Sequence, residues 1–382
     1  MTRAALLLSA LLAAAPVAAQ ESPEWAGVWE GRVGTHPVRL CIDSHGGPAR
    51  GGYYYLSRLE PIPITEEDGE GGWIEKTPEG EPSALWEFVE QTGQELRGTW
   101  RQGSRSLRFE LTPLAWTAPE YAGPCSSDAF LGPRIAGGEV LTRPAELNGW
   151  RFTEQTYHPP AHFAEEDVDL ESFTFTPEQP GDARILAELA KGLPTGDYRD
   201  TYLQCMGDTI AVHGTDGKYW TRSHPEFVSD DWLTTMESYG MYCGGAHGDH
   251  GFYHRTFDRR SGEQLDPARW LNETAVEYQT VSGGEGYFNV LPALTELILA
   301  RSPSDVAPGD AATEREAYLE ECRDSVGSWS WRFGLSREGL LAVPIVPHVL
   351  GPCRAVFTVP WVELAAFLNE EGRAGAARLL DD

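Results

Sequence analysis

The stretch Ser238-Tyr239-Gly240-Met241-Tyr242-Cys243-Gly244-Gly245-Ala246-His247 decides how the second half of this chain is expected to fold. Its tyrosines suit a pleated surface, and its double glycine ends a strand or lets another backbone approach closely. A returning strand is predicted over His254–Phe257, a turn over Asp258–Gly262 and the opening of a short helix at Asp266-Pro267. The pattern predicts a strand, a glycine-rich loop, a second strand and a helical turn.

These elements resemble the extracytoplasmic domain of RsiV-type anti-sigma factors, a family of largely unknown function. The family's hallmark is a tyrosine-bearing strand, a Gly-Gly-Ala-His loop, a strand ending in Phe-Asp, a turn with glycine and a leucine before a helix. A second match is the run Phe333-Gly334-Leu335, followed by Gly339-Leu340 and by residues 356–364. The resemblance covers residues 145 to 375. One difference is that Gly248-Asp249 stands where the family usually has a proline after the histidine.

The resemblance implies an α+β domain that binds a partner rather than catalysing a reaction. In RsiV the related domain recognises lysozyme, so a basic muramidase of that kind, or peptidoglycan, is the implied partner. No anti-sigma segment is recognised here, so signalling through a sigma factor is not expected. The expected contact residues lie in the loop and beside it, namely Tyr242, Gly244, Gly245, His247, His250 and His254.

The alternative interpretation is a metal-dependent hydrolase that acts on envelope polymers. His247, Asp249 and His250 are the candidate ligands, because imidazole and carboxylate groups bind Zn²⁺ or Cu²⁺. Their spacing matches no familiar zinc motif, and on a strand His250 shares a face with His254 but not with His247. We therefore favour a non-enzymatic protein without metal or cofactor.

Nucleophilic hydrolysis is a further alternative. Ser238 or Ser282 could act with one of the histidines and Asp258. Neither serine lies in the Gly-x-Ser-x-Gly pattern that forms a nucleophile elbow. This alternative ranks below the metal site.

Residues 1–19 have the pattern of a signal peptide. Arg3 provides the positive charge, Ala4–Ala14 the apolar run and Val17-Ala18-Ala19 the cleavage site. The run is short for a membrane span, and no later segment is apolar for long enough to cross a bilayer. We expect a periplasmic or secreted protein without a membrane span.

The chain is strongly acidic. It has 30 Lys and Arg against 58 Asp and Glu, a formal net charge of −28, and loss of Arg3 with the signal peptide would make it more negative. Such a surface repels nucleic acid and anionic lipid, which bind proteins through Lys and Arg. It attracts basic partners at low salt, although the charge could equally serve solubility alone.

The cysteine count is even, which in an oxidising compartment predicts disulfides. The six cysteines allow 15 connectivities, and none of the pairs has the close spacing of a zinc or redox site. We predict that neighbours in the sequence pair, which gives Cys41–Cys125, Cys205–Cys243 and Cys322–Cys353.

The length of 382 residues predicts two domains. Residues 20–116 contain short strands at hairpin spacing with no helical period, which predicts an antiparallel barrel or sandwich. Residues 117–145 are rich in Pro, Gly and Ala and are predicted to be a linker, and residues 146–382 form the α+β domain. The core of the first domain is expected to contain Trp29, Trp73, Trp86 and Trp100.

Glycines stand beside large aromatic residues in this first domain, which suggests that rings lie over bare backbone at bent strands. In Tyr53-Tyr54-Tyr55 the outer two side chains share one face and the middle one lies on the other. Either one face meets solvent or a partner, or both faces are covered.

In the second domain, hydrophobic spacing predicts an irregular mixture of helices and strands, which favours α+β over a doubly wound sheet. The predicted helices are Ala183–Leu193, Val290–Arg301, Ala311–Cys322 and Trp361–Glu371. The predicted strands are Phe173–Thr176, Thr201–Cys205, Thr209–His213, Glu237–Cys243 and Ala355–Val359.

Overall fold

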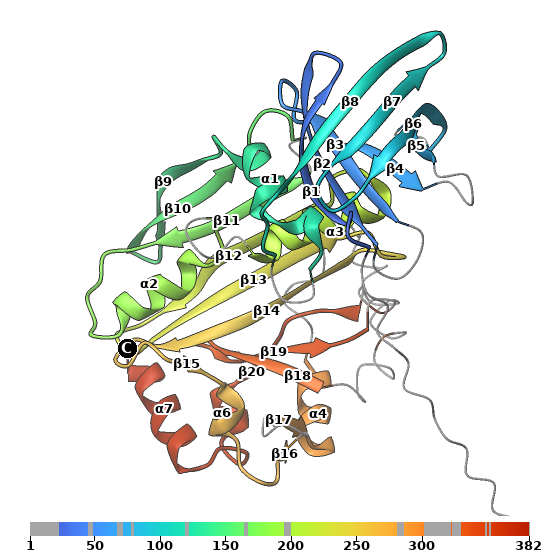
Figure 1. The fold of residues 1–382 in the computed structure, drawn as a ribbon. Helices are drawn as coiled ribbons and strands as arrows, with labels where there is room; N and C mark the ends of the chain where they lie inside the picture. The colour runs from blue at the N-terminus through green and yellow to red at the C-terminus, as the bar shows by residue number, and fades with distance from the viewer. Residues whose placement is uncertain are drawn as a thin grey trace, which may run out of the picture.

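The computed structural model describes residues 23–44, 49–66, 72–77, 80–118, 122–163, 167–194, 200–280, 286–301, 322, 330–347, 350 and 353–381. They form a closed β-barrel at the N-terminal end, then a seven-stranded sheet and two smaller sheets with a few helices (Figure 1). This confirms the predicted α+β class with an all-β first part. The predicted signal peptide, Ser282 and most of the helix predicted from Ala311 lie outside the described residues.

The barrel closes because each strand pairs antiparallel with the next and the last strand returns to the first. Closure leaves no unpaired edge that could add a strand from another molecule. The strands are β1 (Gly27–Val33), β2 (His36–Asp43), β3 (Arg50–Tyr55), β4 (Ile62–Glu66), β5 (Gly72–Lys76), β6 (Pro82–Gln91), β7 (Leu96–Gln102) and β8 (Arg105–Leu114).

Aromatic side chains fill the barrel interior. The four tryptophans expected in this core are all buried, namely Trp29, Trp73, Trp86 and Trp100. One carboxylate lies among them and is fully engaged: Glu75 accepts hydrogen bonds from Tyr53 Oη at 2.7 Å and from Trp100 Nε1 at 2.8 Å. Burial and the neighbouring carboxylate raise the pKa of Tyr53 far above its usual value. The interior is a packed core.

Gly98 shows why bent barrel strands need glycine. A Cβ atom there would lie 2.0 Å from the carbonyl oxygen of Glu87 and 2.6 Å from the ring of Phe109. The ring therefore lies over bare backbone, as the glycine–aromatic pattern predicts. On the outside of the barrel, Tyr54 is buried against Phe130. Both faces of β3 are therefore covered, and the interpretation of its tyrosines as an exposed binding face is wrong.

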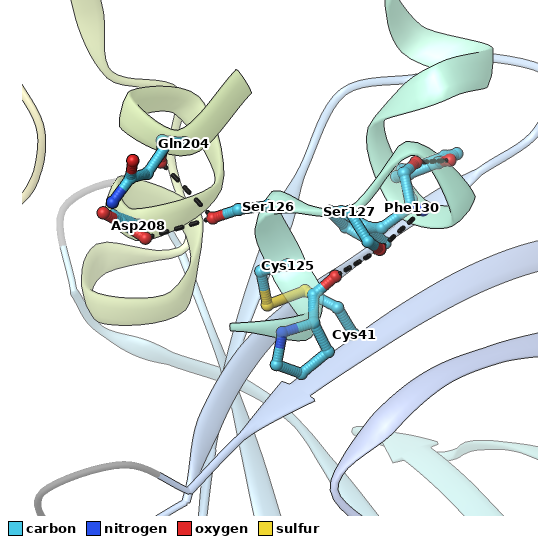
Figure 2. The surroundings of a disulfide bond; sticks show 9 residues. Cys41, Cys125, Ser126, Ser127, Phe130, Gln204 and Asp208 are labelled. Atoms are coloured by element: carbon cyan, nitrogen blue, oxygen red, sulfur yellow. Dashed lines mark hydrogen bonds between the residues drawn. A yellow bond between two sulfur atoms is a disulfide. The ribbon is translucent and has the colours of Figure 1, made fainter. Parts of the chain in front are cut away.

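The segment predicted to be a linker contains ordered structure. It holds the 3₁₀ helix η1 (Pro124–Ser126), the helix α1 (Asp128–Ile135) and the start of strand β9 (Glu139–Leu147). The disulfide Cys41–Cys125 fixes it to β2 (Figure 2). Ser126 Oγ donates a hydrogen bond of 3.0 Å to Asp208 of helix α3 (Asp200–His213). Covalent and polar contacts thus hold a stretch whose composition indicates a linker, while the two domain boundaries stay a prediction.

The large sheet has the strand order β15-β14-β13-β12-β11-β10-β9. Its pairs are antiparallel except for β11 with β12, and the connection between those two carries helices α2 (Asp182–Ala190) and α3, as a parallel crossover requires. The remaining strands are β10 (Trp150–His158), β11 (Val168–Thr174), β12 (Lys218–Val228), β13 (Trp232–Tyr242), β14 (Asp249–Asp258) and β15 (Gln264–Leu265).

The strands predicted at Thr201–Cys205 and Thr209–His213 are wrong, because both stretches belong to α3. Their β-branched residues favour strands locally. The buried residues Leu203, Met206 and Ile210, however, recur at helical spacing and pack in the core between α3 and the barrel. Tertiary packing of one apolar face outweighs the local preference.

The predicted hairpin forms, but its returning strand begins at Asp249 and not at His254, because β14 pairs with β13 up to the turn. Strand β13 pairs antiparallel with β14 from Trp232 opposite Asp258 to Met241 opposite Asp249. A turn follows, and Asp266 caps the short helix η2 (Pro267–Trp270) by accepting a hydrogen bond from the amide of Ala268 at 3.0 Å.

The C-terminal part packs beside the large sheet around its own apolar core. The single helix predicted over Trp361–Glu371 is wrong: α6 ends at Leu364, and Asn369 caps the next helix by accepting a hydrogen bond from the amide of Gly372 at 2.9 Å. The elements are β16 (Val276–Thr280), β17 (Gly286–Val290), α4 (Pro292–Leu299), β18 (Ser330–Leu335), β19 (Gly339–Ile345), β20 (Phe357–Pro360), α6 (Trp361–Leu364) and α7 (Glu370–Asp381).

A buried ion pair joins the barrel to the large sheet. Arg134 of α1 is 0% exposed and binds both carboxylate oxygens of Asp216 at 2.6 and 2.7 Å. Its Nε donates to the carbonyl of Leu59, which follows β3, at 2.7 Å. Every nitrogen of this guanidinium therefore has a partner, and the two partner residues, Asp216 and Leu59, come from different parts of the chain.

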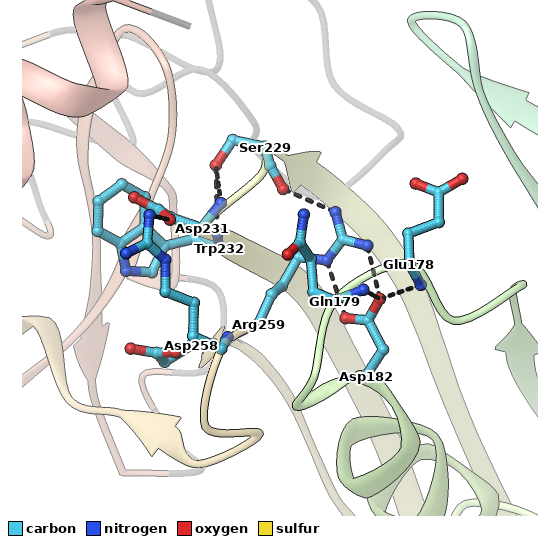
Figure 3. Close-up of polar contacts among 9 residues, drawn as sticks. Glu178, Gln179, Asp182, Ser229, Asp231, Trp232, Asp258 and Arg259 are labelled. Atoms are coloured by element: carbon cyan, nitrogen blue, oxygen red, sulfur yellow. Dashed lines mark hydrogen bonds and ion pairs between the residues drawn. The ribbon is translucent and has the colours of Figure 1, made fainter.

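A second buried ion pair lies at the other end of the sheet (Figure 3). Arg259 binds both oxygens of Asp182, at 3.0 and 2.7 Å, and donates to the carbonyl of Ser229 at 2.8 Å. Burial opposes the charged form of Asp182, but hydrogen bonds from Arg259 and from the amides of Glu178 and Gln179 outweigh it and lower the pKa of this carboxyl. The pair fixes the start of α2 to the turn after β14.

The disulfides Cys41–Cys125, Cys205–Cys243 and Cys322–Cys353 are the pairs that the neighbour rule predicts. They indicate an oxidising, non-cytoplasmic compartment. Of the helices in the described residues, none combines the length and apolar character needed to span a bilayer.

Candidate functional site

The turn that joins β13 to β14 is anchored at its base to the end of α3. The disulfide Cys205–Cys243 links the two elements. The ring of His213 stacks on that of Tyr242, with centroids 6.0 Å apart and planes at 19°. Its Nε2 also lies 3.2 Å from both the carbonyl oxygen of Gly244 and the hydroxyl of Tyr242. A covalent bond and polar contacts therefore fix the geometry of the turn.

The tip of this turn faces solvent. Gly245, His247 and His250 are exposed, while Tyr242 and Gly244 at the base are half-buried. The Nδ1 atom of His247 lies 3.0 Å from the carbonyl oxygen of Gly248, a contact within the turn itself. The structure thus brings together all the predicted contact residues except His254.

His254 lies in the core beneath β18 and is 4% exposed. A Cβ atom on Gly334 of β18 would lie 2.5 Å from the Cβ of His254, so the two strands pack closely there. Neither ring nitrogen has a hydrogen-bond partner among the described residues, and burial lowers the pKa of His254 to about 4. Its expected place on the exposed contact surface is wrong, because β18, distant in sequence, covers that face of β14.

The candidate metal ligands do not form a ligand set. Within the described ranges, no group of three or more His, Cys, Asp or Glu side chains is arranged to hold a metal ion. Asp249 instead approaches Arg354, with Oδ1 at 3.9 Å from Nη2, and its other oxygen lies 3.4 Å from the hydroxyl of Tyr239. The arrangement gives the metal-dependent hydrolase no support.

The residues of the nucleophilic alternative lie apart. Asp258 pairs with Trp232, at the far end of the hairpin from His247, and its Oδ1 accepts hydrogen bonds from the amides of Arg260 and Ser261 at 2.7 and 2.9 Å. Ser238 pairs with Phe252 in the middle of the hairpin. The carboxylate therefore closes a turn rather than orienting a catalytic histidine.

The structure contains a second feature that the sequence analysis missed, a cleft of about 380 Å³ beside the turn. We call it the tyrosine–arginine cleft. Its lining from the large sheet includes Tyr219, Tyr239 and Tyr253, one from each of β12, β13 and β14, and its lining from the C-terminal part includes Arg332 and Arg354. Alternation of side chains along the predicted hairpin could have placed Tyr239 and Tyr253 on one face of the sheet. Nothing in the sequence brings the arginines to them.

A polar cluster lies next to this cleft on the same strands. Oε1 of Glu237 accepts hydrogen bonds from Ser223 at 2.8 Å, Thr235 at 2.6 Å and Arg255 Nη2 at 2.8 Å. These donors all bind one oxygen of Glu237, and they connect β12, β13 and β14 on this face of the sheet. The cleft differs, because Nη1 of Arg354 at its border has no hydrogen-bond partner among the described residues.

Comparison with known proteins found no matching family model and no matching curated protein. Two solved structures described as DUF3298 family proteins are similar. One, from Pseudomonas aeruginosa, has 15% identity and a TM-score of 0.34, and the match covers 61% of this chain and 94% of that one. The other, from Bacteroides fragilis, has 14% identity and a TM-score of 0.36, with 64% and 96% covered. The RsiV-type assignment is not confirmed.

Proposed function

We propose that this protein is a non-enzymatic recognition protein of the cell envelope that docks a basic protein of the lysozyme class through the β13–β14 turn. The observation that carries the proposal is a tip that is exposed and yet fixed at its base by Cys205–Cys243 and by His213. A loop held in one conformation loses little entropy on binding, which favours a docking role.

The charge of the chain supports a basic partner. With a formal net charge of −28, the protein attracts cations over a range that salt shortens. Lysozyme is small, compact and basic, so both its charge and its folded surface suit an exposed turn on an acidic protein.

The test is retention of the exported protein on immobilised hen lysozyme, with immobilised cytochrome c as a control of similar charge. We expect retention on lysozyme that falls at about 0.5 M salt, because ions screen the attraction. Equal retention on both columns would show charge alone and contradict specific recognition.

The turn is tested by the double substitution His247→Ala with His250→Ala. Both side chains are exposed, so the fold is expected to persist while lysozyme binding weakens about tenfold, the loss typical of a contact residue. His158→Ala is the matched control, since His158 is an exposed histidine on β10. Unchanged binding in the double variant would place the contact surface elsewhere.

Peptidoglycan is the second candidate partner, and the tyrosine–arginine cleft favours it. Tyrosine rings pack on sugar faces and their hydroxyls form hydrogen bonds with sugars. Co-sedimentation with insoluble peptidoglycan tests this candidate, and Tyr253→Ala is expected to reduce the bound fraction. Binding to lysozyme without co-sedimentation would exclude it.

A further inference from the structure

We infer that the tyrosine–arginine cleft binds the carboxylate of a small acid with an apolar or sugar body, held by Arg354 and Arg332. The site lies beside the turn, but residues of β12, β13 and β14 and of the C-terminal part line it, and none of them is among the predicted contact residues of the turn. It therefore goes beyond docking of a basic protein, and either activity can fail without the other.

Arg354 is a largely buried cation that has no short ion pair among the described residues. Its side chain is 10% exposed, and its Nη1 is buried without a hydrogen-bond partner among the described residues. Its Nη2 donates to the carbonyl of Val346 at 3.2 Å, and the carboxylate of Asp249, which is 48% exposed, lies 3.9 Å away. A buried charge is costly unless it is paired. A ligand carboxylate in the cleft would give this guanidinium a charged partner at short range.

Gly251 lets the guanidinium of Arg354 and the hydroxyl of Tyr239 approach the backbone of β14 closely. A Cβ atom there would lie 2.9 Å from Nη1 of Arg354 and 3.0 Å from the hydroxyl of Tyr239. The missing side chain leaves the guanidinium and the hydroxyl directed over the same bare stretch of β14. A guanidinium and a hydroxyl that converge at the border of a cleft suit an oxygen anion.

Arg332 gives the cleft a second cation. Its guanidinium lies 4.5 Å from the ring centroid of Tyr253, and the side chain is otherwise exposed. Arg332 and Arg354 are the charged side chains that the described lining contributes. The protein as a whole has a net charge of −28 and repels anions. A cleft lined by two arginines is a local exception that favours an anionic ligand.

The other wall is apolar and accounts for the body of the ligand. Val343, Pro344 and Ile345 of β19 line it, and Ile345 is 44% exposed. The volume of about 380 Å³ falls within the range of pockets for small ligands. A carboxylate attached to an apolar body fits this wall better than free phosphate, which has no apolar part.

Two matched pairs of probes test the inference by calorimetry. Acetyl-alanyl-alanine is compared with its C-terminal amide, and N-acetylmuramic acid with N-acetylglucosamine, which lacks the carboxylate. We expect at least one acid to bind about tenfold more tightly than its uncharged counterpart. The acid that binds identifies the source as a peptide or a sugar. If neither acid exceeds its counterpart, or if inorganic phosphate binds while both acids fail, the inference is overturned.

Variants then assign the binding to the cleft. Arg354→Met is expected to weaken acid binding about tenfold, and Gly251→Ala to weaken it by displacing the guanidinium of Arg354 without removing a charge. Arg143→Met is the control, because Arg143 is 79% exposed on β9. Binding that survives both cleft variants overturns the assignment, and Gly251→Ala keeps the test valid if Arg354→Met does not fold.

Discussion

Arg134 and Arg354 are both buried arginines, but their surroundings differ. Arg134 joins the barrel to the sheet, and each of its nitrogens donates to an oxygen of Asp216 or Leu59. Arg354 borders the tyrosine–arginine cleft, and its Nη1 has no hydrogen-bond partner among the described residues. The comparison teaches that a saturated buried charge serves structure, whereas an unsaturated one beside a cleft is available to a ligand.

Arg134→Met has the largest expected effect on stability. It leaves the carboxylate of Asp216, which is 12% exposed, without its bidentate partner. The free energy of unfolding is expected to fall by about 3 to 5 kcal/mol, because an uncompensated buried charge remains. Urea denaturation measures the loss. The double variant Arg134→Met with Asp216→Leu should recover much of it, and a loss below about 1 kcal/mol would mean that the pair is not structurally important.

Removal of Cys322–Cys353 tests how Arg354 is positioned, because this disulfide holds the residue before it. Replacing both cysteines by alanine is expected to lower the free energy of unfolding by about 3 kcal/mol, since the unfolded chain regains the entropy of a loop. Acid binding should weaken at the same time. The control replaces Cys205 and Cys243 by alanine, which should destabilise similarly and leave acid binding intact. Equal acid binding in the two double variants would show that Cys322–Cys353 does not position Arg354.

His254 sharpens the comparison, because its buried ring has no hydrogen-bond partner among the described residues and yet it can lose its charge, which arginine cannot do. Its pKa is about 4 in the folded state and about 6.5 in the unfolded state. Below pH ~6.5 the unfolded chain binds the proton and the folded one does not, so stability falls as the pH drops toward ~4, by about 3 kcal/mol in all.

Comparison with His254→Leu isolates this contribution. Urea denaturation at pH 7 and at about pH 4 should show a smaller loss of stability in the variant, because other titrating groups act on both proteins. Equal losses in the two proteins would show that His254 is protonated in the folded state.

Arg354→Met should have the smallest effect on stability. Methionine fills part of the volume and removes an unpaired donor, so the free energy of unfolding is expected to change by less than about 1 kcal/mol in either direction. Thermal denaturation checks this. A loss as large as that of Arg134→Met would abolish the distinction between the two arginines.

Several features of the fold follow from the sequence alone. Short strands at hairpin spacing predicted the barrel, and their tryptophans predicted its core. Asp266-Pro267 predicted the start of η2. The cysteine pairs followed from their order along the chain. Strand alternation and capping act between near neighbours, so the local sequence carries that information. The cysteine pairs are less local, since Cys41 and Cys125 lie 84 residues apart.

The strand predictions within α3 and the exposed position predicted for His254 failed for the same reason. Ile210 is buried in the core that α3 shares with the barrel, and His254 is buried beneath β18. Residues distant in the sequence impose both environments, so local propensity says nothing about them.

The sequence by itself determined the α+β class, the barrel core, the disulfide pairs and the hairpin with its exposed turn. Only the tertiary structure decided that Arg134 meets Asp216 and that Arg354 lies over Gly251 without a full set of partners. The physical reason is that the cost of burying a charge depends on which distant groups surround it, and the folded arrangement alone fixes those neighbours.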